Sequence, residues 1–335
     1  MRWRSLRPPA ALWVYGIVLL MTLGMGVSSP GSLEPRHLMD LLRQAAPLGI
    51  VAIGQALLLM SAQIDLSLGA QITLYNVVLS TVMRSGSDDT IVVAVLLTII
   101  AAVVVGLVNG LAVTRLHIPS FVATLASSSV IAGAYLLYTK GAPSGSIAPG
   151  FRVIAEGWIG NAIPWAAVIW IGAAIVVAFL LNRGRFGREL LAVGGNPAAS
   201  HLSGLNVRRT IVLSFVAASL LAALSSCILS AYIGIASNTV GDPYTLNSIA
   251  AAVIGGTAFT GGEGTIAGTV AGALLMTVLQ AILTMLNTGD AAKLVAQGLI
   301  IIMMMAIYQW KAIAQRLPFR AWQRRRAGTA ADATD

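Results

Sequence analysis

The sequence predicts an all-α fold, a polytopic bundle of transmembrane helices, and three observations lead to it. Of the 335 residues, 57% are hydrophobic and only 10% are charged, whereas a soluble domain carries roughly 25% charged residues. Long apolar runs recur along the chain, and a helix needs roughly 20 such residues to cross a bilayer. The runs also lack the period-two alternation that is typical of transmembrane β-barrels.

Ten apolar runs define the predicted spans. They cover residues 11–28, 45–61, 66–83, 91–111, 121–138, 163–181, 211–233, 246–259, 266–286 and 294–309. The first run follows a basic start, as in a signal peptide, but in a chain with many spans we interpret it as an uncleaved first helix. Runs 246–259 and 266–286 are the halves of one split segment, and we count each half as a passage. We find no strong internal sequence repeat.

The distribution of charge favours an even number of spans. With the N-terminus in the cytoplasm, ten spans place 15 of the 21 lysines and arginines on the cytoplasmic side, as the positive-inside rule requires. An odd number would place the Arg-rich C-terminal tail outside. We therefore expect one membrane domain over 1–317 and a disordered basic tail over 318–335, with both termini cytoplasmic. The same rule explains the net charge of +9 more simply than nucleic-acid binding does.

Residues 181–212 form a charged stretch between two apolar runs. Five arginines surround a short core that contains Ala198 and Ala199. Asn196 is a good N-cap residue, so we predict a short helix over 196–204. A plain connection between spans needs only a few polar residues, whereas a short helix on a basic loop is suited to docking a cytoplasmic partner.

The turn that contains Asp65, Ser67 and Gly69 interrupts two apolar runs. Asp65 could cap the next helix or face a solute pathway, and the two roles are compatible. Amide and hydroxyl groups within the spans fit a neutral polyol better than an ion, although an inter-helix hydrogen bond is the simpler explanation for each one alone. The candidate pathway residues are Gln55, Asp65, Ser67, Asn76 and Asn109.

Glycines break the split segment between its halves. A broken helix at membrane depth is found where it lines a cavity or is buried in protein, which favours a functional role over packing alone. Gly264, Gly268 and Gly272 recur at four-residue spacing and predict a bare stripe for close helix contact. The helix-break and packing candidates are Gly255, Gly256, Gly261, Gly262, Gly264 and Gly268.

Enzyme signatures are missing from the sequence. It contains no Gly-Lys dipeptide and hence no phosphate-binding P-loop. The three histidines are isolated, without metal-ligand spacing, so we assign no catalytic residue, metal or cofactor. Few ionisable residues lie within the spans, which argues against a buried proton relay and points to a partner as the source of energy.

Three segments in order resemble the ribose/xylose/galactose-type permeases of bacterial ABC importers, a family that includes autoinducer-2 importers. They are QIDLSLG, RFGRELLAVGGNPAASHLSGLNV and AAAVIGGTAFTGGEGTIAGTVAGALL. The resemblance implies a ten-helix permease in the bacterial inner membrane that pairs with a second copy or a sister permease. It implies a separate cytoplasmic ATPase, which binds the ATP, and a periplasmic sugar-binding protein.

The same resemblance assigns coupling to the ATPase to Arg185, Gly187, Arg188, Gly194, Gly195, Asn196, Ala198, Ala199 and Gly204. The chain departs from the family at 60–63, where Met-Ser-Ala-Gln replaces small, Thr- and Gly-rich residues. The identity of the transported solute therefore stays open. The expected function is translocation of a monosaccharide or similar small polyol. The alternatives are import of an autoinducer-2 type furanosyl signal, an ion-coupled secondary carrier and an intramembrane enzyme.

Overall fold

The structure is a computed structural model that describes residues 10–84, 86–289, 291–296, 298–299 and 302–303. The chain divides into two compact units, Met1–Asn287 and Thr288–Asp335. In the second unit, residues 291–296 are helical. Most of the predicted tenth span, 294–309, and the whole predicted tail, 318–335, lie outside the described residues.

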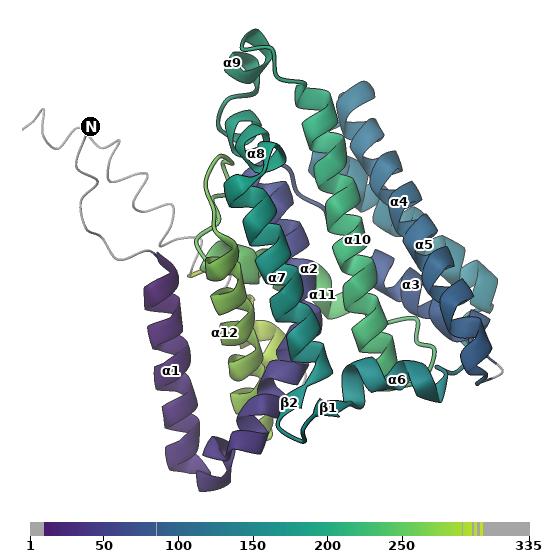
Figure 1. Cartoon of the computed structure of the whole chain (residues 1–335), viewed down its shortest axis with the longest axis vertical. Coiled ribbons are helices and arrows are strands. Elements are labelled where there is room, and N and C mark those ends of the chain that lie inside the picture. The colour runs from purple at the N-terminus through teal and green to yellow at the C-terminus, as the bar shows by residue number, and fades with distance from the viewer. Residues whose placement is uncertain (1–9, 85, 290, 297, 300–301, 304–335) are drawn as a thin grey trace, which may run out of the picture. The chain divides into compact units, whose positions relative to one another are not determined.

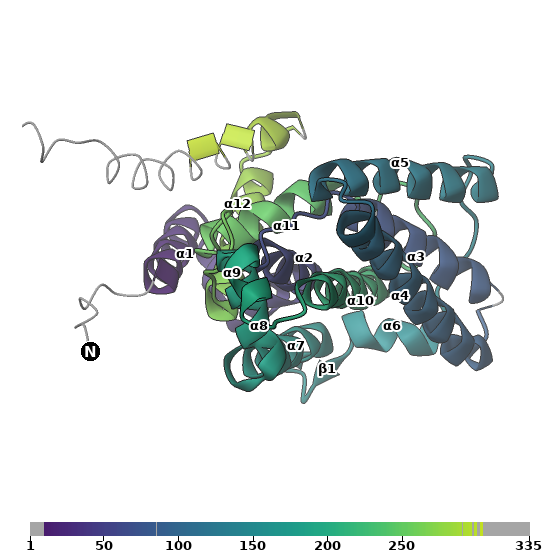
Figure 2. The ribbon, with the colours of Figure 1, turned by 90° about the horizontal axis from the view of Figure 1, so that it is seen from above.

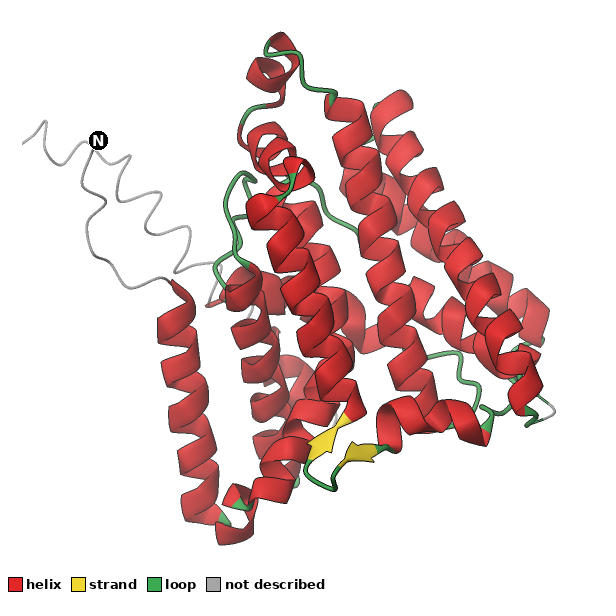
Figure 3. Ribbon diagram, viewed as in Figure 1, coloured by secondary structure: helices red, strands yellow, loops and turns green. Residues whose placement is uncertain are grey.

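The described part of the first unit is almost entirely helical (Figure 3). Its helices are α1 (Ala10–Ser28), α2 (Pro35–Met60), α3 (Leu68–Val82), α4 (Ile91–Arg115), α5 (Ser120–Thr139), α6 (Pro149–Glu156), α7 (Trp165–Arg183), α8 (Arg185–Gly195), α9 (Pro197–Leu202), α10 (Val207–Ile233), α11 (Asp242–Ile254) and α12 (Ile266–Met285). Two short 3₁₀ helices, η1 (Pro30–Leu33) and η2 (Asp88–Thr90), precede α2 and α4. The helical fold class is thereby confirmed.

The structure does not confirm the prediction of ten spans. Nine of the predicted runs coincide with α1, α2, α3, α4, α5, α7, α10, α11 and α12. Among the described residues, six helices are long and apolar enough to cross a membrane. Helices α3 and α11 have only 15 and 13 residues, so α11 is roughly 20 Å long at 1.5 Å per residue. That is short of the roughly 30 Å hydrocarbon core.

Two long helices, α2 and α10, occupy the centre of the unit when it is seen from above (Figure 2). Each is followed by an irregular segment, then by a short helix, α3 or α11, and then by a longer helix, α4 or α12. The partners are exchanged: α2 packs on α11 and α12, whereas α10 packs on α3 and α4. Each half of the chain therefore buries the apolar surface of the other.

The two short helices begin against each other. The backbone N–H of Gly69, at the start of α3, donates to Thr245 Oγ1 at 3.2 Å. The N–H of Gly241, just before α11, donates to Thr73 Oγ1 at 3.0 Å. The first N–H groups of a helix have no partner within it, and here each helix supplies the threonine that its neighbour needs.

The helix pair α11 and α12 is antiparallel. A side chain at Gly268 would collide with the carbonyl of Gly255, and one at Gly272 with that of Ala251. Moving forward along one helix therefore moves backward along the other, and the chain reverses over 255–265. Gly264 precedes α12 instead of belonging to its stripe, and lies against Met60.

The ends of the unit differ (Figure 1). Helices α8 and α9 lie at one end, which we call the α9 end. Helix α6 and the hairpin of β1 (Trp158–Ile159) and β2 (Ile163–Pro164) lie at the other, the α6 end. The strands pair antiparallel, with Trp158 opposite Pro164. Residues 140–161, which connect α5 to β2, thus contain α6 and β1.

Candidate functional site

The charged stretch 181–212 forms two helices instead of the single one predicted. Helix α8 buries Gly187, Leu190, Val193 and Gly194 and leaves its arginines outside. Arg185 Nε donates to Glu189 at 2.6 Å, and Arg188 donates to the carbonyl of Arg183 at 3.1 Å. A side chain at Gly187 would collide with the carbonyl of Leu181, so this glycine lets α8 fold back tightly on the end of α7.

Helix α9 is capped by Asn196 and is exposed. Asn196 Oδ1 accepts a hydrogen bond from the N–H of Ala199 at 2.9 Å, the geometry that the sequence predicts for an N-cap. The helix ends at Leu202, two residues before the predicted end, and Gly204 then turns the chain at φ +80°. Ala198 and Ala199 are exposed, and Leu202 is 88% exposed at the tip.

A shallow groove of about 830 Å³ lies beside α9. It separates α9 from the last turn of α4 and the first turns of α10. Ala198, His201 and Gly204 line one side, and His117 and Arg208 contribute from the other elements. Together with Leu202, the groove gives α9 both a protruding apolar side chain and a recess.

The end of α8 packs on backbone alone. A side chain at Gly194 would overlap the carbonyl oxygen of Met60, the last residue of α2. The same oxygen accepts a hydrogen bond from the N–H of Gly262 at 2.9 Å. Three segments that are far apart in the sequence, 60–62, 194–195 and 261–264, therefore meet at one point, which we call the junction.

The glycine-rich break supplies the third side of the junction. Gly261 and Gly262 have φ of +82° and +77°, a region that L side chains rarely adopt. This turn brings Gly262 against Gly195 and Gly261 against Ala62. The other glycines of the break lie nearby: Gly255 against α12, Gly256 in the following turn at φ +90°, and Gly264 under Met60.

The turn between α2 and α3 leads from the junction into the bundle. Its backbone is irregular, and irregular backbone at membrane depth needs partners from the protein. The N–H of Ile64 donates to Ser120 Oγ at 3.2 Å, and that of Leu66 donates to Thr124 Oγ1 at 3.0 Å. Both acceptors lie in the first two turns of α5, so α5 stabilises the irregular turn between α2 and α3.

Asp65 is the centre of a buried hydrogen-bond network. Its Oδ1 accepts from the N–H of Ser67 at 2.7 Å and from Ser67 Oγ at 2.5 Å. Its Oδ2 accepts from the amides of Gln71 at 3.2 Å and Asn109 at 3.5 Å. Gln71 Oε1 in turn accepts from Tyr75 and, at 2.7 Å, from Ser219 of α10. The network thus joins α3, α4 and α10.

Four of the five predicted pathway residues are therefore engaged with the protein. Asp65, Ser67 and Asn109 belong to the network. Asn76 accepts from the N–H of Ser237 at 2.8 Å and donates to Ser230 at 2.9 Å, which holds the irregular segment before α11. Gln55 differs: it is completely buried, and in the part of the chain that the structure describes neither atom of its amide has a hydrogen-bond partner.

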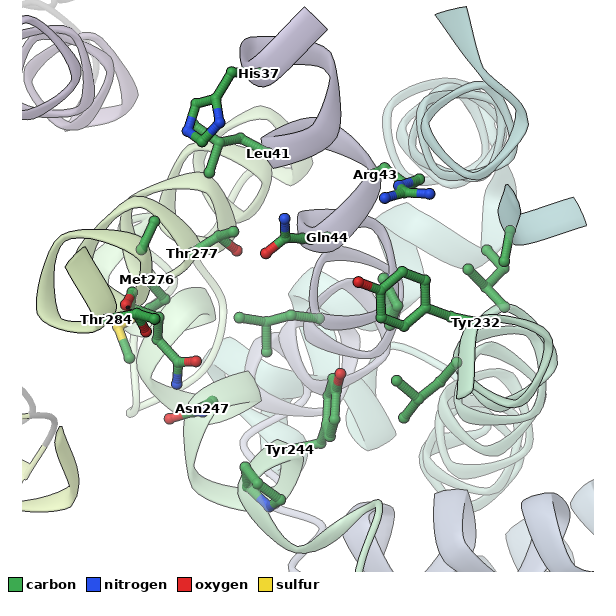
Figure 4. A pocket seen from close by; sticks show the side chains of 18 of the residues that line it. His37, Leu41, Arg43, Gln44, Tyr232, Tyr244, Asn247, Met276, Thr277 and Thr284 are labelled. Atoms are coloured by element: carbon green, nitrogen blue, oxygen red, sulfur yellow. Dashed lines mark hydrogen bonds between the residues drawn. The ribbon is translucent and has the colours of Figure 1, made fainter. Parts of the chain in front are cut away.

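A separate pocket of about 580 Å³ lies near the α6 end, between α2, α10, α11 and α12 (Figure 4). We call it the four-helix pocket. None of the five predicted pathway residues lines it. Its polar lining residues are His37, Arg43, Gln44, Tyr232, Tyr244, Asn247, Thr277, Gln280 and Thr284.

Sequence reasoning missed several of these residues. Helix α8 had a usable signal, because Gly187, Leu190 and Gly194 follow the helical spacing of a buried face. Thr73, Thr245 and Ser219 gave no signal, since a threonine or serine in an apolar run usually bonds its own helix. Met60 takes part through its carbonyl oxygen, which no side-chain pattern can indicate.

Comparisons with known proteins show which family the chain belongs to. The family described as "Branched-chain amino acid transport system / permease component" matches residues 37–307. The ribose import permease protein RbsC of Bacillus subtilis is 34% identical over 289 residues, which is 86% of this chain and 88% of the relative.

Two further relatives have similar coverage. The galactose/methyl galactoside import permease protein MglC of Haemophilus influenzae is 32% identical over 87% of this chain and 91% of its own. RbsC of Escherichia coli is 32% identical over 86% and 90%. No solved structure matches the chain significantly. These matches show that the chain belongs to the family of permease components of branched-chain amino acid transport systems.

Proposed function

We propose that this chain is the membrane-spanning subunit of an ABC importer for a monosaccharide or a similar small polyol. The relatives are permeases for ribose and for galactose or methyl galactoside. In this function the chain is not itself an enzyme: a separate subunit hydrolyses ATP, and this subunit converts the movement of that ATPase into alternating access.

The observation that carries the proposal is the junction. Helix α9 is exposed at one end of the unit, and α8 behind it rests on the carbonyl of Met60 without an intervening side chain. Backbone contacts cannot yield by a change of rotamer, so a push on α9 and α8 reaches the end of α2 and the break at 261–264. An ATPase docked on α9 would act on both segments at once.

The partners follow from this role. The ATPase docks at the α9 end, which we place in the cytoplasm together with both termini, in a bacterial inner membrane. A periplasmic sugar-binding protein delivers the solute at the α6 end. A second permease copy or a sister permease completes the dimer, and ten membrane passages, counting α3 and α11, remain our proposal for the topology.

The docking role can be tested on the assembled importer with Ala199→Glu. Ala199 is exposed on α9, and a carboxylate that becomes buried and unpaired costs several kcal/mol. The affinity for the ATPase should fall by roughly tenfold or more, and uptake should fall with it. Ala142→Glu, at an exposed position outside α8 and α9, is the matched control and should leave both unchanged.

Uptake into liposomes separates the importer from a carrier that works alone. We expect sugar uptake only when the ATPase, the binding protein and ATP are all present. Uptake by the isolated chain under an ion gradient would instead establish a secondary carrier. Normal ATPase affinity in Ala199→Glu would show that α9 is not the docking element.

A further inference from the structure

We propose that the four-helix pocket binds the transported solute, and that this solute is neutral and polyhydroxylated. The proposal deepens the proposed function and rests on it. The pocket is formed by α2 and α10 on one side and by α11 and α12 on the other, with Ala155 of α6 at its edge. It therefore lies where a solute delivered at the α6 end would first meet the bundle.

Three unpaired amides from three helices line the pocket. They belong to Gln44 of α2, Asn247 of α11 and Gln280 of α12. Among the described residues, none of the three side chains has a hydrogen-bond partner, although Gln44 is exposed and Gln280 is half-buried, so water can reach both. Asn247 is only 5% exposed, and Figure 4 shows it at the wall of the pocket, opposite Gln44. These amides open onto the pocket, so a ligand there could bind all three.

The lining offers a cation no counter-charge. None of the described residues that line the pocket is an aspartate or glutamate, so a cation would find no counter-charge. The one arginine, Arg43, pairs through one Nη with Asp40 at 3.0 Å and lies over the ring of Tyr232 at 5.3 Å, while its buried Nε has no hydrogen-bond partner among the described residues and is a further donor for a hydroxyl group. An amide offers both donors and an acceptor, which suits hydroxyl groups that both donate and accept.

Size and shape agree with a sugar-like ligand. A volume of about 580 Å³ falls within the roughly 300–1,000 Å³ of small-molecule pockets. Tyr232 and Tyr244 each combine an apolar ring with a polar hydroxyl. Such rings can cover the C–H faces of a polyol while the amides bind its hydroxyl groups.

Gln55 lies deeper in the bundle, on the same face of α2 that lines the pocket. At 3.6 residues per turn, His37, Leu41, Gln44, Leu48 and Gln55 lie on one face of α2, and the first four line the pocket. Gln55 is two turns beyond Leu48, roughly 10 Å deeper, and its amide has no hydrogen-bond partner among the described residues. Gln55 is completely buried and lies outside the pocket lining, so a solute would reach it only when the surrounding helices move apart.

The test uses the complete importer in liposomes, with its ATPase and binding protein. Uptake is measured for a panel of labelled aldopentoses and aldohexoses that includes ribose and galactose. The variants are Gln44→Leu, Asn247→Leu and Gln280→Leu. The control is Asn182→Leu, which replaces an exposed amide of α7 outside the pocket. Each pocket variant should lower uptake by up to roughly tenfold, as the loss of one hydrogen bond predicts, with ATPase assembly unchanged.

Occupancy is measured independently with Asn247→Cys in a Cys227→Ala background. We expect the transported sugar to slow the reaction of this cysteine with a water-soluble thiol reagent. If Asn247→Leu fails to assemble, the mutational test relies on Gln44→Leu, because Gln44 is exposed.

The outcomes separate the pocket from the function. If the wild-type importer takes up sugar but the assembled leucine variants transport normally and no protection occurs, the pocket proposal is overturned and the function stands. If the wild-type importer takes up no sugar of the panel, the proposed function fails and the pocket proposal fails with it.

Discussion

The N–H of Gly241 donates to Thr73 Oγ1, and this bond of 3.0 Å ties the start of α11 to the first turns of α3. Its counterpart joins Gly69 to Thr245. In each half a glycine precedes its threonine by four residues, although the intervening residues differ completely, AQI in one and DPY in the other. The pair closes two helix starts that would otherwise expose unpaired N–H groups inside the bundle.

Replacing Thr73 or Thr245 by valine should destabilise the fold, because it removes an acceptor and leaves a buried N–H unpaired. The expected loss is about 1–3 kcal/mol of unfolding free energy for each change, measured by thermal unfolding in detergent. The double variant should lose less than the sum, since contacts within one cluster are not additive.

Thr98→Val is the control for these variants. Thr98 is as buried as Thr73, but its hydroxyl donates to the carbonyl of Ala94 in its own helix, so no N–H loses its partner. A loss in Thr98→Val as large as that in Thr73→Val would mean that the reciprocal bonds contribute nothing special.

Gly194→Ala should disrupt the junction, because the new methyl group would overlap the carbonyl of Met60. We expect reduced assembly with the ATPase and uncoupled ATP hydrolysis in what does assemble. The neighbouring change Gly195→Ala is the matched control: there the nearest atom, the Cα of Gly262, is 3.9 Å from the new Cβ. Equal behaviour of the two variants would rule out close packing at Gly194.

Asp65→Asn should weaken the network that joins α3, α4 and α10. All four groups that contact the carboxyl group are donors, so the asparagine N–H₂ would face donors instead of acceptors. The expected loss is about 1–3 kcal/mol in thermal unfolding. Asp89→Asn, at an exposed carboxylate, should be neutral. Unchanged stability in Asp65→Asn would show that the network does not hold these helices together.

The topology can be tested with single cysteines in a Cys227→Ala background. Cysteines at residues 88 and 144 should react from outside, and those at 197 and 330 only from the cytoplasm. Ser144 is preferable to Gly145, whose φ of +147° and contact with the carbonyl of Ser80 exclude a side chain. Reaction of residue 330 from outside would establish an odd number of passages.

Much of the fold could be predicted from the sequence because a membrane helix is recognised by the length of its apolar run. The Asn196 cap and the break at 255–265 were also predictable, since asparagine before a helix and clustered glycines have direct backbone consequences. These features depend on residues that are close together in the chain.

The features that were not predictable depend on distant residues. The shortness of α3 and α11 follows from their meeting each other, and nothing in an apolar run distinguishes such a helix from a full span. The pathway residues show the same limit. Asn76 and Asn109 are polar groups in spans, but their partners Ser237 and Asp65 lie elsewhere in the chain. Asn247 of the four-helix pocket has the same sequence signature but no side-chain hydrogen bond among the described residues.

The exchange of partners between the two halves has a consequence for how the protein is made. Gly69 and Thr245 are 176 residues apart, and Gln71 and Ser219 are 148 apart. When α3 and α4 enter the membrane, α10 and α11 have not yet been synthesised. The first half must wait in the bilayer with its polar groups incompletely paired. A chain cut short before α10 would stay in that state, and its uncovered polar groups would distinguish it from the finished protein for a membrane protease.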